Sequence, residues 1–153
     1  MQPCLVISQL IHTQVLELLS HSFRVIPNMT REPLPREELL RRSREADALM
    51  IFTPDAIDRA FVKACPRLRI VAATFEGFGN VDVEACTEHG IWFTSIQHDP
   101  FLPPDLASDA DEVRAANVLE AASCIFEALT GQVPKSAVNH PLNQEFIVPP
   151  TQP

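Results

Sequence analysis

Glycine is scarce in this sequence. Only four of its 153 residues are glycines, at positions 77, 79, 90 and 131. A dinucleotide-binding turn uses three glycines at the spacing G-x-G-x-x-G, so that the backbone can approach a pyrophosphate. The four glycines do not have that spacing. We therefore expect no nucleotide-binding domain of this kind in the sequence, and no bound cofactor.

Long apolar runs and an excess of positive charge are also missing. No apolar run reaches the ~18 residues of a membrane span. The first four residues, Met1-Gln2-Pro3-Cys4, lack the basic residues that open a signal peptide. We therefore expect a cytoplasmic protein with no membrane contact. Its formal net charge is −8. Because phosphate backbones require clustered Lys and Arg, we also expect no nucleic-acid partner.

Metal-binding spacings are absent as well. The four cysteines contain no C-x-x-C pair, and each has apolar neighbours: Cys4, Cys65, Cys86 and Cys124. This pattern predicts four reduced thiols in the core. Four of the histidines are dispersed along the chain: His12, His21, His89 and His140. They give no spacing typical of metal ligands, so we expect no bound metal.

Apolar segments alternate regularly with helix-like segments over the first 95 residues. Apolar strands are predicted at 5–7, 23–26, 48–52, 68–75 and 91–94. Helices are predicted between them, at 12–19, 35–45, 54–65 and 81–88. Strands that are nearly all apolar are typical of parallel sheets covered on both faces. The pattern predicts an α/β fold, a flavodoxin-like, doubly wound parallel five-stranded sheet.

The alternation ends after residue 95. Residues 96–107 form a proline-rich connector, and Ser108 is the predicted N-cap of a returning helix, 108–131. That helix has an apolar stripe that must pack on the sheet: Val118, Ala122, Ile125, Phe126 and Leu129. We expect a single domain over 1–133. The proline-rich tail, 134–153, is predicted to be an extended arm outside the core.

The turn at 74–80 is the strongest candidate for a ligand site. It leaves the carboxyl end of a predicted strand, where open α/β sheets bind ligands. Gly77 and Gly79 let the backbone come close to a ligand and direct N–H groups at it, which suits a small oxyanion or organic acid. The carboxylate of Glu76 opposes such a ligand. Phe75 and Phe78 flank the turn, and either line a pocket or anchor the loop.

The first 95 residues resemble the substrate domain of the D-2-hydroxyacid dehydrogenase family, and within it the phosphite (phosphonate) dehydrogenases. The resemblance is carried by the segments 5–7, 36–42, 64–69, 77–83 and 85–87. Residues 108–139 resemble the C-terminus of the same family, where the last helix crosses back to complete the substrate domain. The resemblance implies that a nucleotide-binding domain, normally inserted after the fifth strand, is missing between these two pieces.

The family's catalytic Arg, Glu and His come from that domain or from the segment that rejoins the substrate domain. The turn's usual Lys is matched here by Glu76, a reversal of charge, and a Met that lines the family site is matched by Thr53. The resemblance therefore implies a ligand-binding set without autonomous NAD-dependent activity: Thr53, Phe75, Glu76, Gly77, Phe78, Gly79 and Asn80.

Three hypotheses follow for the function. The first is a redox-inactive substrate domain that binds a small oxyanion or organic acid, or a protein partner. The second is a non-redox enzyme that uses Glu76, with His98 as a further candidate, as acid or base. The third is an accessory subunit of a full-length dehydrogenase. Apolar surface that a nucleotide-binding domain would cover predicts a homo-oligomer, a protein partner or strong packing of the tail.

Overall fold

The computed structural model describes residues 2–96 and 110–141, with the side chains of 110–112 excluded. The main sheet has five parallel strands in the order β2-β1-β3-β5-β7. Its strands are β1 (Cys4–Ile7), β2 (Arg24–Ile26), β3 (Ala48–Ile51), β5 (Ile70–Ala73) and β7 (Trp92–Thr94). This order confirms the predicted flavodoxin-like doubly wound sheet.

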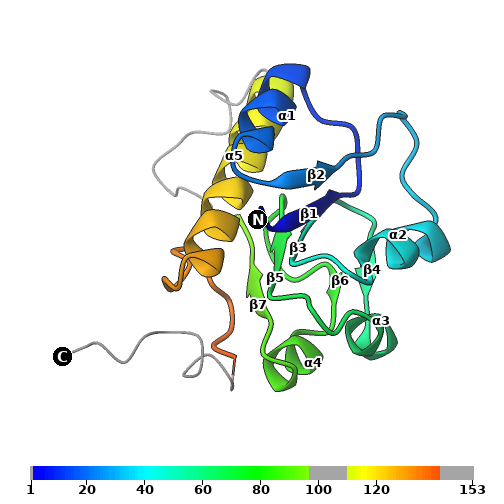
Figure 1. Cartoon of the computed structure of the whole chain (residues 1–153), viewed down its shortest axis with the longest axis vertical. Coiled ribbons are helices and arrows are strands. Elements are labelled where there is room, and N and C mark those ends of the chain that lie inside the picture. Colours follow the sequence, from blue (N-terminus) through cyan, green and yellow to red (C-terminus); the bar gives the residue numbers. More distant parts are fainter. Residues whose placement is uncertain (1, 97–109, 142–153) are drawn as a thin grey trace.

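Helices cover both faces of the sheet (Figure 1). The helices are α1 (Thr13–Ser20), α2 (Arg36–Ser43), α3 (Arg59–Ala64), α4 (Val83–Glu88) and α5 (Ala110–Leu129). Helices α1 and α5 pack on one face in a core with Leu5, Trp92 and Ile125. Helices α2, α3 and α4 pack on the other face. All four cysteines are free and buried, which confirms the prediction of reduced core thiols.

Two short strands outside the main sheet were not predicted. Strands β4 (Ala56–Ile57) and β6 (Asn80–Val81) pair in parallel as a separate two-stranded sheet. The predicted helices at 54–65 and 81–88 therefore begin later, after capping aspartates. The Asp58 side chain accepts from Phe61 N at the start of α3, and the Asp82 side chain accepts from Ala85 N at the start of α4. The second sheet holds the downstream end of the glycine turn.

The apolar stripe of α5 lies slightly to one side of the predicted one. Val118, Ala122 and Ile125 are buried, as expected, but Phe126 is 51% exposed. The stripe is completed by residues at i+3 and i+4 spacing: Ala121, Cys124 and Ala128. Phe126 falls on the flank of that stripe, so its assignment to the core was wrong. The predicted N-cap, Ser108, lies outside the described residues.

The first residues of the predicted tail are part of the folded domain. Ala137 forms an antiparallel bridge with Thr94, and Val138 N donates to Phe93 O at 2.8 Å. Asn139 Oδ1 accepts from Phe93 N at 2.8 Å. These bonds cover the outer edge of β7, which would otherwise present unpaired backbone groups. The expectation of an arm outside the core is therefore wrong for 134–139, and 142–153 lie outside the described residues.

No helix in the described ranges is long and apolar enough to cross a bilayer.

Candidate ligand-binding site

The start of the glycine turn is fixed by hydrogen bonds from both sides. Thr74 donates from its backbone N and from Oγ1 to Ile51 O, at 3.1 and 3.0 Å. Ile96 N donates to Phe75 O at 2.9 Å. The turn therefore starts from a rigid position between β3 and the segment that follows β7.

The two glycines of the turn have different surroundings. Both have positive φ, 81° at Gly77 and 55° at Gly79. A Cβ atom at Gly79 would lie 2.7 Å from Cε1 of Phe75, whereas one at Gly77 would meet no atom within 4 Å. The Phe75 ring is partly buried against the core that α2, α3 and α4 cover. Phe75 therefore anchors the turn, and Gly79 allows the backbone to fold over its ring.

The tip of the turn offers backbone donors. In the part of the chain that the structure describes, no acceptor is hydrogen-bonded to the N–H groups of Gly77, Phe78 and Gly79. The C-terminal end of the turn is held in place by two contacts: Val81 N donates to Phe78 O at 3.2 Å, and β6 pairs with β4. Successive N–H groups in a glycine turn of this kind form a concave site for an anion.

The remaining predicted site residues lie at the surface. Glu76, Asn80 and Thr53 are exposed, and Phe78 is 58% exposed. Thr53 follows β3, the strand beside β5, and its carbonyl accepts from Gln9 Nε2 at 2.8 Å. A half-buried carboxylate would have favoured an acid–base role for Glu76, but the residue is exposed. His98 lies outside the described residues.

A buried polar network at the carboxyl edge of the sheet was missed by the sequence analysis. Ser8 follows β1 and Asp55 follows β3, on either side of the point where the strand order reverses. The Ser8 hydroxyl donates to Asp55 Oδ2, which also accepts from Phe52 N at 3.0 Å. Asn28 Nδ2 donates to Ser8 O at 3.0 Å. Small polar residues within four positions of the ends of β1, β2 and β3 are the signal that could have found it.

This network fills the usual binding crevice. Open α/β sheets bind ligands at the point of strand reversal, but here Ser8, Asn28 and Asp55 are all less than 9% exposed. Burial raises the pKa of the Asp55 carboxyl, while the hydrogen bonds from Phe52 N and Ser8 oppose that rise. Because these side chains satisfy one another, the glycine turn after β5 is the more open site on this edge.

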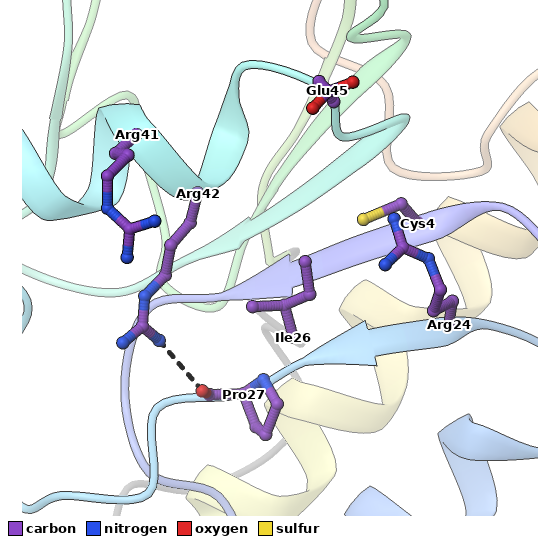
Figure 2. Close-up of a pocket in the computed structure, with 7 residues that line it drawn as sticks. All are labelled: Cys4, Arg24, Ile26, Pro27, Arg41, Arg42 and Glu45. Carbon is purple, nitrogen blue, oxygen red and sulfur yellow. Dashed lines mark hydrogen bonds between the residues drawn. The ribbon is translucent and has the colours of Figure 1, made fainter.

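A hollow of about 510 Å³ lies at the opposite, amino-terminal edge of the sheet. Figure 2 shows Arg41 and Arg42 of α2 facing Arg24 of β2 across it. Arg41 and Arg42 both pair with one carboxylate, Glu38, whose pKa falls to about 2, chiefly through those hydrogen bonds. Arg42 also donates to Pro27 O at 3.0 Å. Glu38 therefore offsets part of the positive charge of these two arginines.

No metal centre accompanies the glycine turn in the described ranges, where no group of three or more His, Cys, Asp or Glu side chains is placed to hold a metal ion.

The fold and the turn together define an α/β domain with an exposed glycine turn at the carboxyl edge of its sheet. A sequence profile of the D-isomer specific 2-hydroxyacid dehydrogenase catalytic domain matches residues 4–139. The chain therefore belongs to this family, as the sequence resemblance predicted.

Known relatives agree with that assignment. A glyoxylate reductase from Aeropyrum pernix is 37% identical over 127 residues, which cover 83% of this chain and 36% of that protein. A glyoxylate reductase from Thermococcus kodakarensis is 36% identical over 110 residues, covering 72% of this chain and 31% of that enzyme. The chain thus spans about a third of the length of these relatives.

Solved structures show the same fold. The PH0520 protein from Pyrococcus horikoshii superposes with a TM-score of 0.57 at 23% identity, covering 63% of this chain and 28% of that one. The TT0316 protein from Thermus thermophilus superposes with a TM-score of 0.54 at 27% identity, covering 64% of this chain and 30% of that one.

Proposed function

We propose that this domain binds a small 2-oxo or 2-hydroxy acid, or a phosphorus oxyanion such as phosphite, at the glycine turn. The observation that carries the proposal is the row of backbone N–H groups at Gly77, Phe78 and Gly79 without acceptors among the described residues. Hydrogen bonds from N–H groups to an ionised acceptor are about twice as strong as neutral ones. The names of the glyoxylate reductase relatives make glyoxylate the first ligand to test.

Glu76 is compatible with weak binding of such a ligand. Its carboxylate is exposed, so water screens its repulsion of an anion. At a separation of ~6 Å in water, two unit charges repel by only about 0.7 kcal/mol. Two or three charge-assisted hydrogen bonds outweigh that term, and they correspond to an affinity on the order of 1 mM.

We propose in addition that the domain does not transfer hydride by itself. All four glycines lie in turns at positive φ, and none belongs to a G-x-G-x-x-G sequence that would hold a dinucleotide. The catalytic Lys that the resemblance places in the turn of phosphite dehydrogenases is replaced by Glu76. The domain would thus hold an acid without the cofactor that reduces or oxidises it.

A thermal-shift and calorimetric screen tests the proposal. Glyoxylate, D-lactate and phosphite at 10–50 mM are the probes, with NAD and sodium chloride of equal ionic strength as controls. We expect at least one acid to raise Tm and NAD to leave it unchanged. With a Kd of about 1 mM, these concentrations should add about 1.4–2.3 kcal/mol of stability. No shift with any of the acids would contradict binding at the turn, and a shift with NAD would contradict the lack of cofactor binding.

The Glu76→Lys variant sharpens the test. It removes a repulsion and adds an attraction, each about 0.7 kcal/mol at ~6 Å, so affinity should rise about tenfold. Glu37→Lys, at an exposed position on α2, makes the same change of net charge away from the turn and serves as the matched control. Equal gains in both variants would point to a non-specific charge effect and contradict a site at the turn.

A protein partner is the second candidate, favoured by Phe78. This large apolar side chain is 58% exposed at the tip of the turn. Exposed aromatic side chains often mark interfaces, and we propose a second copy of this chain or a full-length dehydrogenase as the partner. Sedimentation velocity of the domain, alone and mixed with such an enzyme, tests this proposal. A monomer when the domain sediments alone at about 100 µM, together with unchanged sedimentation of both proteins in the mixture, would contradict it.

A further inference from the structure

A separate hollow lies between α1 and α5, which run side by side in Figure 1. Its volume is about 420 Å³, which is within the range typical of small-molecule pockets. The residues that matter for its chemistry are Ile11, His12, Val15, Arg31, Arg114 and Val118. None of these residues belongs to the glycine turn or to the Ser8–Asp55 network.

The floor of this hollow is apolar. Ile11 and Val118 are 8% and 2% exposed, and Val15 is partly buried against the same core. These side chains come from two distant parts of the chain, around the start of α1 and in α5, so the floor exists only in the folded protein. An apolar floor attracts the hydrocarbon part of a ligand, and it disfavours a fully hydrated anion such as phosphate.

The rim of the hollow carries positive charge. Arg31 and Arg114 line it, and no Asp or Glu is among its lining residues in the described part of the chain. This is unusual in a chain with a formal net charge of −8. The hollow at the amino-terminal edge is different, because Glu45 lines it and because two of its arginines, Arg41 and Arg42, already pair with Glu38.

Arg114 is held in place without an acidic partner among the described residues. Its NH2 group donates to Leu10 O at 2.7 Å, and its guanidinium lies 4.6 Å from the centroid of the Phe52 ring. A weaker contact joins the same NH2 group to Gln9 Oε1 at 3.5 Å. No hydrogen bond to a described residue uses Nε or NH1. A guanidinium fixed in this way can bind a carboxylate with little loss of side-chain entropy.

We propose that this hollow binds a monocarboxylate with an aliphatic or aromatic tail. The carboxylate pairs with Arg31 and Arg114 at the rim, and the tail covers Ile11, Val15 and Val118. A ligand with both a carboxylate and an apolar tail matches this lining best. A purely apolar ligand would not pair with the guanidinium groups, and an inorganic anion would not cover the apolar floor. The site is additional to the glycine turn and does not depend on it.

Calorimetry on the full chain with sodium hexanoate tests this proposal. We expect saturable binding, and weaker binding of both acetate, which lacks the tail, and hexan-1-ol, which lacks the charge. Arg31→Gln should weaken hexanoate by up to about fivefold, the upper end for one exposed charged pair. Arg24→Gln at the other hollow is the matched control and should leave affinity unchanged. Equal binding of hexan-1-ol, or equal losses in both Arg variants, would overturn the proposal.

Two further variants separate this site from the glycine turn. Ala115→Phe, at a partly exposed position in the lining, should abolish hexanoate binding by filling the hollow, with Tm monitored to verify folding. Glu76→Lys should leave hexanoate affinity unchanged while strengthening glyoxylate binding at the turn. A change in hexanoate affinity with Glu76→Lys but not with Ala115→Phe would overturn the proposal and assign hexanoate to the turn. Absence of hexanoate binding to the unmodified chain would overturn it outright.

Discussion

Substituting the two glycines of the turn with alanine should have unequal effects on stability. Gly77 and Gly79 both have positive φ, so alanine at either position adopts a left-handed conformation that costs about 1–2 kcal/mol. Only Gly79 adds a steric term, because its new Cβ would lie 2.7 Å from Cε1 and 2.8 Å from Cζ of Phe75. The Phe75 ring is partly buried against the core and cannot move aside freely.

The steric clash with Phe75 sets the expected difference in stability between the Gly79→Ala and Gly77→Ala variants. Forcing one extra carbon into a packed site costs about 1–3 kcal/mol. We therefore expect Gly79→Ala to lower the free energy of unfolding by about 1–3 kcal/mol more than Gly77→Ala. For a chain of this size, each kcal/mol corresponds to roughly 2–4 °C in Tm. Equilibrium unfolding in urea, followed by circular dichroism, measures the difference directly.

A double-mutant cycle with Phe75→Ala tests the stated cause. In that background the ring is gone, so Gly79→Ala should cost no more than Gly77→Ala, which leaves a coupling energy of about 1–3 kcal/mol between positions 75 and 79. Equal costs for the two glycine variants with Phe75 intact would refute the reasoning. A coupling energy near zero would also refute it.

Three further predictions concern hydrogen bonds and charge. Asn139→Ala removes bonds to Phe93 N and Ile91 O, so it should lower the free energy of unfolding in urea by about 2 kcal/mol. The exposed control Gln132→Ala should change it by less than about 0.5 kcal/mol, and equal effects would contradict a structural role for Asn139. Burial raises the pKa of Asp55 above 3.8, so the folded state holds this proton more tightly than the unfolded state. The group's contribution to stability therefore falls as pH rises from about 4 through the raised pKa of the folded state. Asp55→Asn, unfolded in urea at about pH 4 and about pH 7, should therefore gain stability relative to the native chain between these two values; a constant difference would contradict this. The pKa of Glu38 is lowered from 4.5 to about 2, so its stabilising effect is complete above pH 4.5 and is lost as pH falls toward 2. In Glu38→Gln, the free energy of unfolding in urea should therefore depend less on pH over that window. An unchanged pH profile would contradict the pairing of Glu38 with Arg41 and Arg42.

Much of the fold could be predicted from the sequence because its strands are nearly all apolar. Segments such as 48–52 and 91–94 have few polar side chains, which is the signature of strands covered on both faces by helices. The glycine turn could be placed at the carboxyl edge for the same reason, since its position follows from the strand that precedes it. Four helices and five strands alternating along the chain then leave few possible topologies.

Features that depend on long-range contacts could not be predicted. Strands β4 and β6 have two residues each, too few to show a pattern, and they exist because each supplies the other's pairing partner. Asn139 is a polar residue in a proline-rich segment, and only the outer edge of β7 explains its bonds to Phe93 and Ile91. The burial of Asp55 depends on Ser8, 47 positions earlier in the chain.

The flank position of Phe126 has a different cause. A stripe of apolar residues predicts that a helix packs on the sheet, but α5 is rich in alanine, so several rotations of the helix bury similar apolar area. The packing that exists selects the small residues Ala121 and Ala128 for the contact with the sheet and leaves Phe126 at the surface. Periodicity alone does not resolve a shift of this size.

Amide chemical shifts in a titration with glyoxylate test the central claim most directly. If the glycine turn is the binding site, the amide signals of Gly77, Phe78 and Gly79 should move most, with one common dissociation constant in the millimolar range. Amides at the amino-terminal edge, such as that of Arg24, should stay in place. Shifts spread evenly over the surface, or a turn that does not respond while the melting temperature rises, would contradict the claim that the turn binds the acid.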